Sequence, residues 1–236
     1  MKTRKLMILF VSILFFTTIL LFCELAVFAA SETPSEIISD TKEALIDMDI
    51  ALDSGVFRSV LRKAKGVAIF PSLTEVAVFG LGGQGGKGIV LRKDRETGKW
   101  YGPAFLKVSA FGIGARAGIQ SIDLLLVINS TSGLEAFMEK SFKFGGTLAW
   151  TLGPIGRSVS AEIDSESGSP IYSYSVTKGL YFDAGSLQGS TIKEYSTGNR
   201  KFWGEELSNR TILETKVVSN PEVLKICNYI DNLGDD

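Results

Sequence analysis

The residues whose spacing is most suggestive of chemistry are the glycines and the lysine of GGQGGKG at 82–88. A glycine-dense turn can bind an anion, because its backbone N–H groups converge in a nest and a lysine adds positive charge. The alternative is a flexible or bulged turn that only connects two strands. Both interpretations stay open, and Lys87 is taken as a candidate anion-binding residue.

A second concentration of charge lies in VFRSVLRKAK at 56–65, which is predicted to be a short helix. Its apolar residues recur at helical spacing. The basic residues lie on or beside the opposite side, and they are Arg58, Arg62, Lys63 and Lys65. A basic amphipathic helix is typical of contact with an anionic membrane surface, where each basic residue contributes about 1 kcal/mol. The alternative is a helix that packs on the core and exposes its basic side to solvent.

Most other chemistry is excluded by composition or context. The chain has no histidine, which excludes Ser-His-Asp and Cys-His catalysis and histidine metal sites. A phosphate-binding P-loop would need Gly at position 81 and Ser or Thr at position 88, which are Leu81 and Gly88. GIGARAG at 112–118 has one residue too many for a dinucleotide fingerprint, and strand-like sequence follows it. These absences sharply narrow the enzyme classes that are possible, and we predict no catalytic residues, no metal and no cofactor. An enzyme that lacks histidine is the alternative.

The N-terminus reads as a secretory signal peptide at 1–29. Three basic residues precede an uncharged apolar run at 6–22, and Val27 and Ala29 occupy the small-residue positions of a cleavage site. An uncleaved anchor is the alternative. A single domain is then predicted at 30–236, in a periplasmic or secreted protein. The net charge of −1 gives no reason to expect a nucleic-acid partner.

The elements that must position these residues are predicted from hydrophobic runs and punctuating glycine and proline. The segment 65–93 reads as three short strands, at 67–70, 75–79 and 88–91. The apolar run LLLVI at 124–128 predicts a central strand that is buried on both faces. Capping motifs beginning at Thr33, Ser132 and Ser219 predict helices. We expect an α+β fold, an antiparallel barrel or strongly bent sheet of about eight strands with N- and C-terminal helices packed on it.

Five segments together resemble the SYLF domain family, over roughly residues 35–232. They are KAKGVAIFP at 63–71, GGQGGKG at 82–88, GARAGIQSIDLLLVI at 114–128, GPIGRSVSAE at 153–162 and YSYSVTKGLYFDAGSLQGS at 172–190. The last two are the more specific, because GP-x-GR followed by a Tyr-Ser-rich strand and a KGL turn is an unusual combination.

The resemblance implies a non-enzymatic phospholipid-binding module. Eukaryotic members bind phosphoinositides through a basic amphipathic N-terminal segment, and some fungal members bind and bundle actin. Carried onto this chain, Arg58, Arg62, Lys63 and Lys65 would face headgroups, with Lys87 as a further lipid-binding candidate. The acidic first helix and the predicted secretion signal depart from the family pattern and favour an anionic phospholipid membrane of the cell envelope. The alternative is a protein-interaction or structural module of the envelope.

Overall fold

The structure is a computed structural model, which describes residues 32–52, 55–78, 81–113, 118–143, 151–153, 171–178 and 189–235. The chain divides into two compact units, Met1–Thr33 and Pro34–Asp236, and the fold below is that of the second unit. The signal peptide predicted at 1–29 lies outside the described residues. In the described part of the chain, no helix is both long and apolar enough to span a bilayer.

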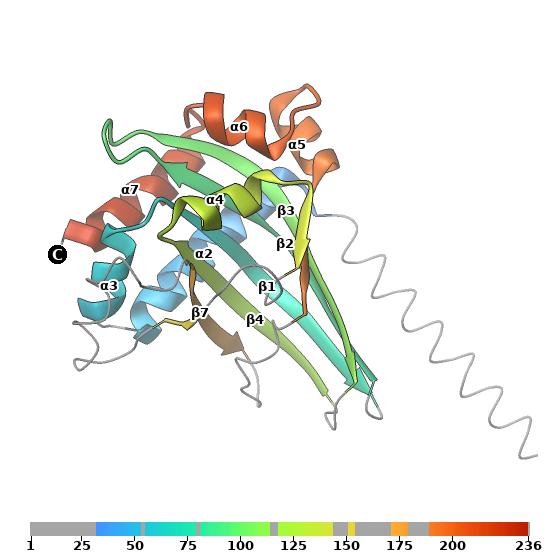
Figure 1. Cartoon of the computed structure of the whole chain (residues 1–236). Coiled ribbons are helices and arrows are strands. Elements are labelled where there is room, and N and C mark those ends of the chain that lie inside the picture. Colours follow the sequence, from blue (N-terminus) through green and yellow to red (C-terminus); the bar gives the residue numbers. More distant parts are fainter. Residues whose placement is uncertain are drawn as a thin grey trace, which may run out of the picture. The chain divides into compact units, whose positions relative to one another are not determined.

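An eight-stranded sheet forms the centre of the second unit, in the order β5-β8-β3-β2-β1-β4-β7-β6 (Figure 1). The strands are β1 (Gly66–Val78), β2 (Leu81–Lys93), β3 (Trp100–Ile113), β4 (Gly118–Ile128), β5 (Ser141–Lys143), β6 (Thr151–Leu152), β7 (Ile171–Lys178) and β8 (Thr191–Glu194). Neighbouring strands pair antiparallel, except that β6 runs parallel to β7. The predicted α+β class, with a strongly bent antiparallel sheet, is confirmed.

Helices cover both faces of this sheet (Figure 1). They are α2 (Pro34–Leu52), α3 (Gly55–Arg62), α4 (Thr131–Met138), α5 (Ser196–Trp203), α6 (Asn209–Thr215) and α7 (Pro221–Asp235). Helices α2, α3 and α7 pack on one face, and α4 and α6 pack on the other. The predicted N- and C-terminal helices therefore share one side of the sheet, and α2 begins at Pro34 as its capping motif predicts.

Each central strand contributes to both hydrophobic cores, because successive side chains point to opposite faces. In β4, Leu125 and Val127 lie in the core under α2, whereas Leu124, Leu126 and Ile128 lie in the core under α4 and α6. All five side chains are 1% exposed or less. The prediction that LLLVI is buried on both faces is confirmed.

The segment 65–93 forms two long strands where three short ones were predicted. The runs at 67–70 and 75–78 belong to one strand, β1, whose pairing with β2 shifts between Ile69 and Thr74. Pro71 lacks an N–H donor, and the bulge that accommodates it places Ser72 at a φ of 51°. Pro71, which predicts the end of a strand, therefore lies within β1.

The glycine-dense segment 82–88 is also a strand, so its prediction as a turn was wrong. Its residues pair with β1 on one side and with β3 on the other. Glycine is needed at position 88 because a Cβ there would lie 2.2 Å from the backbone oxygen of Ile69. Close approach of two strands, and not reversal of the chain, explains this glycine.

Two helices are capped by residues other than those predicted. Ser130 Oγ accepts from Gly133 N at 2.9 Å, so α4 is capped by Ser130 and not by Ser132. Asn220 Oδ1 accepts from Glu222 N at 3.0 Å, so Asn220 caps α7 in place of Ser219. The short elements β5, β8, α5 and α6 were not predicted. The sequence also predicts strands at 147–152, 158–163 and 180–188, of which the last two and most of the first lie outside the described residues.

Candidate functional site

Helix α3 carries Arg58 and Arg62, whereas Lys63 and Lys65 follow its last residue, so the helix is shorter than the predicted 56–65. Its apolar side is buried in the protein. Phe57, Val60 and Leu61 are 1%, 0% and 3% exposed. The Phe57 ring meets the Tyr174 ring edge-on, with 4.8 Å between the centroids. Burial of these side chains stabilises the fold by about 1.5–3 kcal/mol each. Insertion of this apolar side into a bilayer would require α3 to leave the core.

Arg58 is engaged with a carboxylate of the protein itself. Its Nη2 lies 3.6 Å from Asp49 Oδ1, with the two side chains 27% and 19% exposed. The Tyr229 hydroxyl donates to Asp49 Oδ2 at 2.9 Å, so one carboxylate links α2, α3 and α7. Burial, together with the bond to Asp49, raises the pKa of Tyr229 to about 12. Arg58 therefore contributes to helix packing as well as to the charge of this surface.

The segment that follows α3 contacts both the β2–β3 turn and the start of α4. Arg95 Nη1 donates to the backbone oxygen of Lys63 at 3.4 Å, and Lys65 Nζ donates to Thr131 Oγ1 at 2.8 Å. Arg62 and Arg95 are exposed, whereas Lys63 and Lys65 are half-buried. We call Arg62, Lys63, Lys65 and Arg95 the α3 basic surface.

One of the two acidic residues of the same turn, Asp94, is directed into the turn itself. Asp94 Oδ1 accepts from Glu96 N at 3.0 Å and from Thr97 N at 3.1 Å. The backbone bond from Thr97 is the main reason that the pKa of Asp94 lies below its usual value. Arg92 Nη2 lies 3.7 Å from Asp94 Oδ2. Asp94 is thus occupied within the turn and with Arg92.

Lys87 does not join the α3 basic surface. It lies in the middle of β2, opposite Lys107 on β3, with its side chain 7% exposed. The start of β1 pairs with Arg92, which is about 17 Å along β2 from Lys87 at the usual rise per residue. The backbone around Lys87 pairs with the neighbouring strands, so the predicted anion-binding nest was wrong. The structure brings together the basic residues at 58–65 and leaves Lys87 elsewhere.

The described residues include no group of three His, Cys, Asp or Glu side chains placed to hold a metal ion. Cys227 lies on the apolar side of α7 and is 1% exposed. Burial, and secondarily the charge of Asp231, raises the pKa of its thiol to about 12. A thiol in this state is a weak nucleophile.

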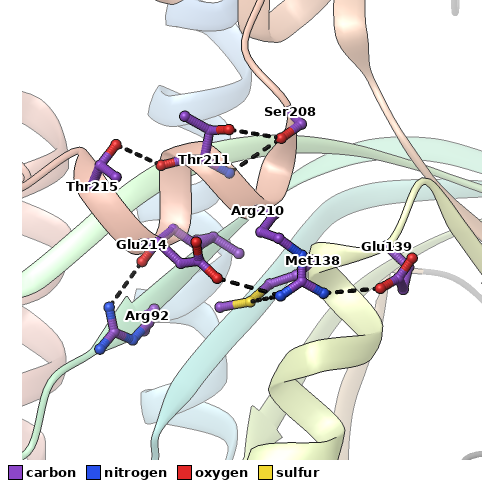
Figure 2. A network of polar contacts seen from close by, with 9 residues as sticks. Arg92, Met138, Glu139, Ser208, Arg210, Thr211, Glu214 and Thr215 are labelled. Carbon is purple, nitrogen blue, oxygen red and sulfur yellow. Dashed lines mark hydrogen bonds and ion pairs between the residues drawn. The ribbon is translucent and has the colours of Figure 1, made fainter.

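A separate polar network ties α6 to α4 and β2 on the other face of the sheet (Figure 2). Arg210 Nη2 lies 2.9 Å from Glu139 Oε1, and Arg210 Nη1 lies 3.3 Å from Glu214 Oε1. Arg92 Nη1 donates to the backbone oxygen of Leu213 at 3.1 Å. These bonds to Glu139 and Glu214 raise the pKa of Arg210. The network is a connection between helices, and its charges are neutralised within the fold.

Comparison with known proteins identifies the family. A model of the family described as "Ysc84: Las17-binding protein actin regulator" matches residues 109–233, more than half of the chain. The chain belongs to the Ysc84 family. The resemblance to SYLF domains is confirmed, and the family description names a regulator of actin, not a catalyst.

Several curated proteins are similar to this Ysc84-family chain. Protein YSC84 of Saccharomyces cerevisiae is 33% identical over 165 residues, which cover 69% of this chain and 34% of the relative. LAS seventeen-binding protein 3 of the same yeast is 32% identical over 167 residues, covering 70% of this chain and 36% of the relative. The human SH3 domain-containing YSC84-like protein 1 is 33% identical over 155 residues, covering 65% of this chain and 44% of the relative. The chain therefore spans between a third and a half of the length of these relatives.

Sequence reasoning found the basic residues of α3 in this Ysc84-family chain but missed Arg95. Arg95 lies in a charged turn far along the chain, and only the pairing of β1 with β2 brings that turn beside α3. No local pattern marks Arg95 as a neighbour of Lys63. Such a residue is found only when the pairing of the strands is known, and the sequence of either segment alone does not predict that pairing.

Proposed function

We propose that this Ysc84-family chain is a non-enzymatic module that binds anionic phospholipid membranes through the α3 basic surface. In this proposal it is a peripheral membrane protein of the cell envelope, periplasmic or secreted, and it needs no cofactor. The observation that carries the proposal is the contact of Arg95 with the Lys63 carbonyl, which adds a cation to the three at the end of α3. Asp94, in the same turn as Arg95, is engaged within that turn and with Arg92.

The mode of binding that this geometry supports is electrostatic attachment and not insertion. The apolar side of α3 is buried, so the gain in free energy comes from cations near anionic headgroups, at about 1 kcal/mol each. Four such residues give a weak, reversible attachment. Because the attraction falls off within a Debye length, about 8 Å at physiological salt, binding weakens steeply as salt is added.

Vesicle flotation tests the proposal. The protein is mixed at low salt with phosphatidylcholine vesicles that either contain or lack phosphatidylglycerol, and recovery with the vesicles is compared. Replacement of the two exposed members, Arg62→Gln with Arg95→Gln, is expected to lower partitioning about thirtyfold. The matched control, Lys201→Gln with Lys225→Gln, removes the same charge from exposed positions on α5 and α7. Equal recovery from neutral and anionic vesicles, or an equal loss in both variants, contradicts the proposal.

A protein partner is the second candidate function. It is favoured by the descriptions of the family and of the yeast relative, which name binding to Las17. In this case a partner in the envelope, and not lipid, would occupy the surface. Chemical cross-linking in cells followed by purification of the chain tests it. One partner recovered at a fixed stoichiometry, with no lipid retained, supports this candidate, whereas recovery of lipid alone contradicts it.

A further inference from the structure

Three lysines on neighbouring strands lie side by side on the sheet. Lys87 on β2 is directly opposite Lys107 on β3, and Lys107 is directly opposite Lys193 on β8. Residues directly opposite one another point to the same face, with their Cα atoms about 4.5–5.5 Å apart. Like charges in this arrangement destabilise a sheet. We call these three residues the lysine row, in which Lys107 and Lys193 are exposed and Lys87 is buried.

The next row on the same face contains hydroxyl groups and another lysine. Ser109 is opposite Gly85 on one side and Thr191 on the other, and Thr191 is opposite Lys143 on β5. Ser109 and Lys143 are exposed, and Thr191 is half-buried. Gly85 has no side chain, which leaves room above the strand for a ligand. None of these four positions carries a carboxylate.

One aromatic ring lies beside two of the ammonium groups. The Nζ atoms of Lys107 and Lys87 lie 4.2 Å and 5.5 Å from the centroid of the Tyr195 ring. The two nitrogens are therefore within about 10 Å of each other, one Debye length at 0.1 M salt. Interaction of a cation with a tyrosine ring contributes about 0.5–1 kcal/mol at an exposed site, which offsets part of the repulsion.

The electrostatic surroundings of Lys107 include the positive charge of Lys87. Desolvation, followed by the charge of Lys87, lowers the pKa of Lys107. In the described part of the chain no ion pair joins a carboxylate to Lys107 or Lys193. The nearest carboxylate along β8, that of Glu194, accepts from Ser196 Oγ at 3.0 Å and from Asn209 N at 2.9 Å. Glu194 is thus engaged at the opposite side of the strand.

We propose that the lysine row, with Ser109 and Thr191, is a binding site for a phosphoryl group. A phosphate ester offers acceptor oxygens to several donors at once, and ammonium and hydroxyl groups are donors that match it. The phosphoryl group has two possible sources, a phospholipid headgroup or a soluble phosphate ester. This site is separate from the α3 basic surface and does not depend on it.

Titration with glycerol 3-phosphate at constant ionic strength tests the site. Reductive methylation with ¹³C gives each lysine its own NMR signal while keeping its charge, and the variants assign the signals. The signals of Lys107 and Lys193 are expected to shift and saturate. Lys107→Gln and Lys193→Gln are each expected to weaken binding about tenfold, the scale of one charge-assisted hydrogen bond. Both side chains are exposed, so neither variant threatens folding, and Lys201→Gln is the matched control.

A second arm, flotation with phosphatidylcholine vesicles with and without phosphatidic acid, distinguishes the two sources. A response to glycerol 3-phosphate alone identifies a soluble ester. Flotation with phosphatidic acid that Lys107→Gln lowers, without a response to glycerol 3-phosphate, identifies a headgroup presented at a surface. No saturable shift with either probe, or an equal loss in Lys201→Gln, overturns the proposal. Arg62→Gln with Arg95→Gln is expected to leave glycerol 3-phosphate binding unchanged, so failure of the membrane proposal is distinguishable from failure of this one.

Discussion

The side-chain amide of Asn199 donates to Asn209 Oδ1 at 3.0 Å, and neither side chain is exposed. Asn199 Oδ1 accepts from Phe105 N at 2.7 Å, and Asn209 Nδ2 donates to the backbone oxygen of Phe137 at 3.1 Å. A continuous chain of buried hydrogen bonds thus joins β3, α5, α6 and α4. This pair of amides adds a polar connection to the apolar contacts that fix α5 and α6 to the sheet.

Asn209→Leu is expected to lower the free energy of unfolding by about 2–4 kcal/mol, because it leaves buried polar groups of Asn199 and Phe137 without partners. Urea unfolding followed by circular dichroism measures the change. The control is Asn228→Leu at an exposed position of α7, which is expected to stay within about 0.5 kcal/mol of the parent. Equal stability of the two variants would show that the amide chain contributes nothing.

Phe57→Ala separates electrostatic attachment from insertion of α3. The Phe57 side chain is 1% exposed, so the variant is expected to lose about 3–5 kcal/mol of unfolding free energy. Binding to anionic vesicles is expected to be unchanged at temperatures where the variant remains folded, since no charge is altered. The opposite pair of results, unchanged stability with lost vesicle binding, would mean that α3 inserts its apolar side into the membrane.

Gly88 and Gly85 provide a matched comparison within one strand. A Cβ at position 88 would lie 2.2 Å from Ile69 O and 2.9 Å from Phe70 Cα, whereas a Cβ at position 85 would lie 3.7 Å from Val108 O. Gly88→Ala is therefore expected to destabilise the fold by about 3 kcal/mol, because backbone must move. Gly85→Ala is expected to be nearly neutral. Thermal unfolding of both variants checks this, and similar melting temperatures would refute the close approach.

Tyr229 is expected to make stability depend on pH in the alkaline range. Its pKa is raised from 10.0 to about 12, so the group stabilises the fold at pH values below 10.0. This contribution is lost as the pH rises from about 10 to about 12, where the hydroxyl next to Asp49 ionises in the folded protein. Urea unfolding at several pH values is compared for the parent and Tyr229→Phe. The pKa of Cys227 is also raised to about 12, but both proteins retain this thiol, so its contribution cancels in the comparison. A difference in stability that stays constant between pH 9 and pH 12 would contradict the assignment.

The sequence predicts some residues of the candidate site correctly and others not. The basic residues at 58–65 are neighbours in sequence, on α3 and in the three residues that follow it, so the sequence alone showed that they lie close together. Lys87 was assigned to a turn because glycine usually marks reversals, but here glycine permits close packing of β1 and β2. The pairing of Asp49 with Arg58 and Tyr229 joins three helices, and no local pattern indicates it.

The sequence by itself determined the α+β class, the first and last helices and the double burial of LLLVI. Each of these depends on side chains within one or two turns or along one strand, where periodicity is visible. Only the tertiary structure decided that Lys107 and Lys193 stand side by side and that Arg95 meets Lys63. These contacts follow from strand register and helix docking, which are set by the packing of the whole core and not by the residues that finally touch.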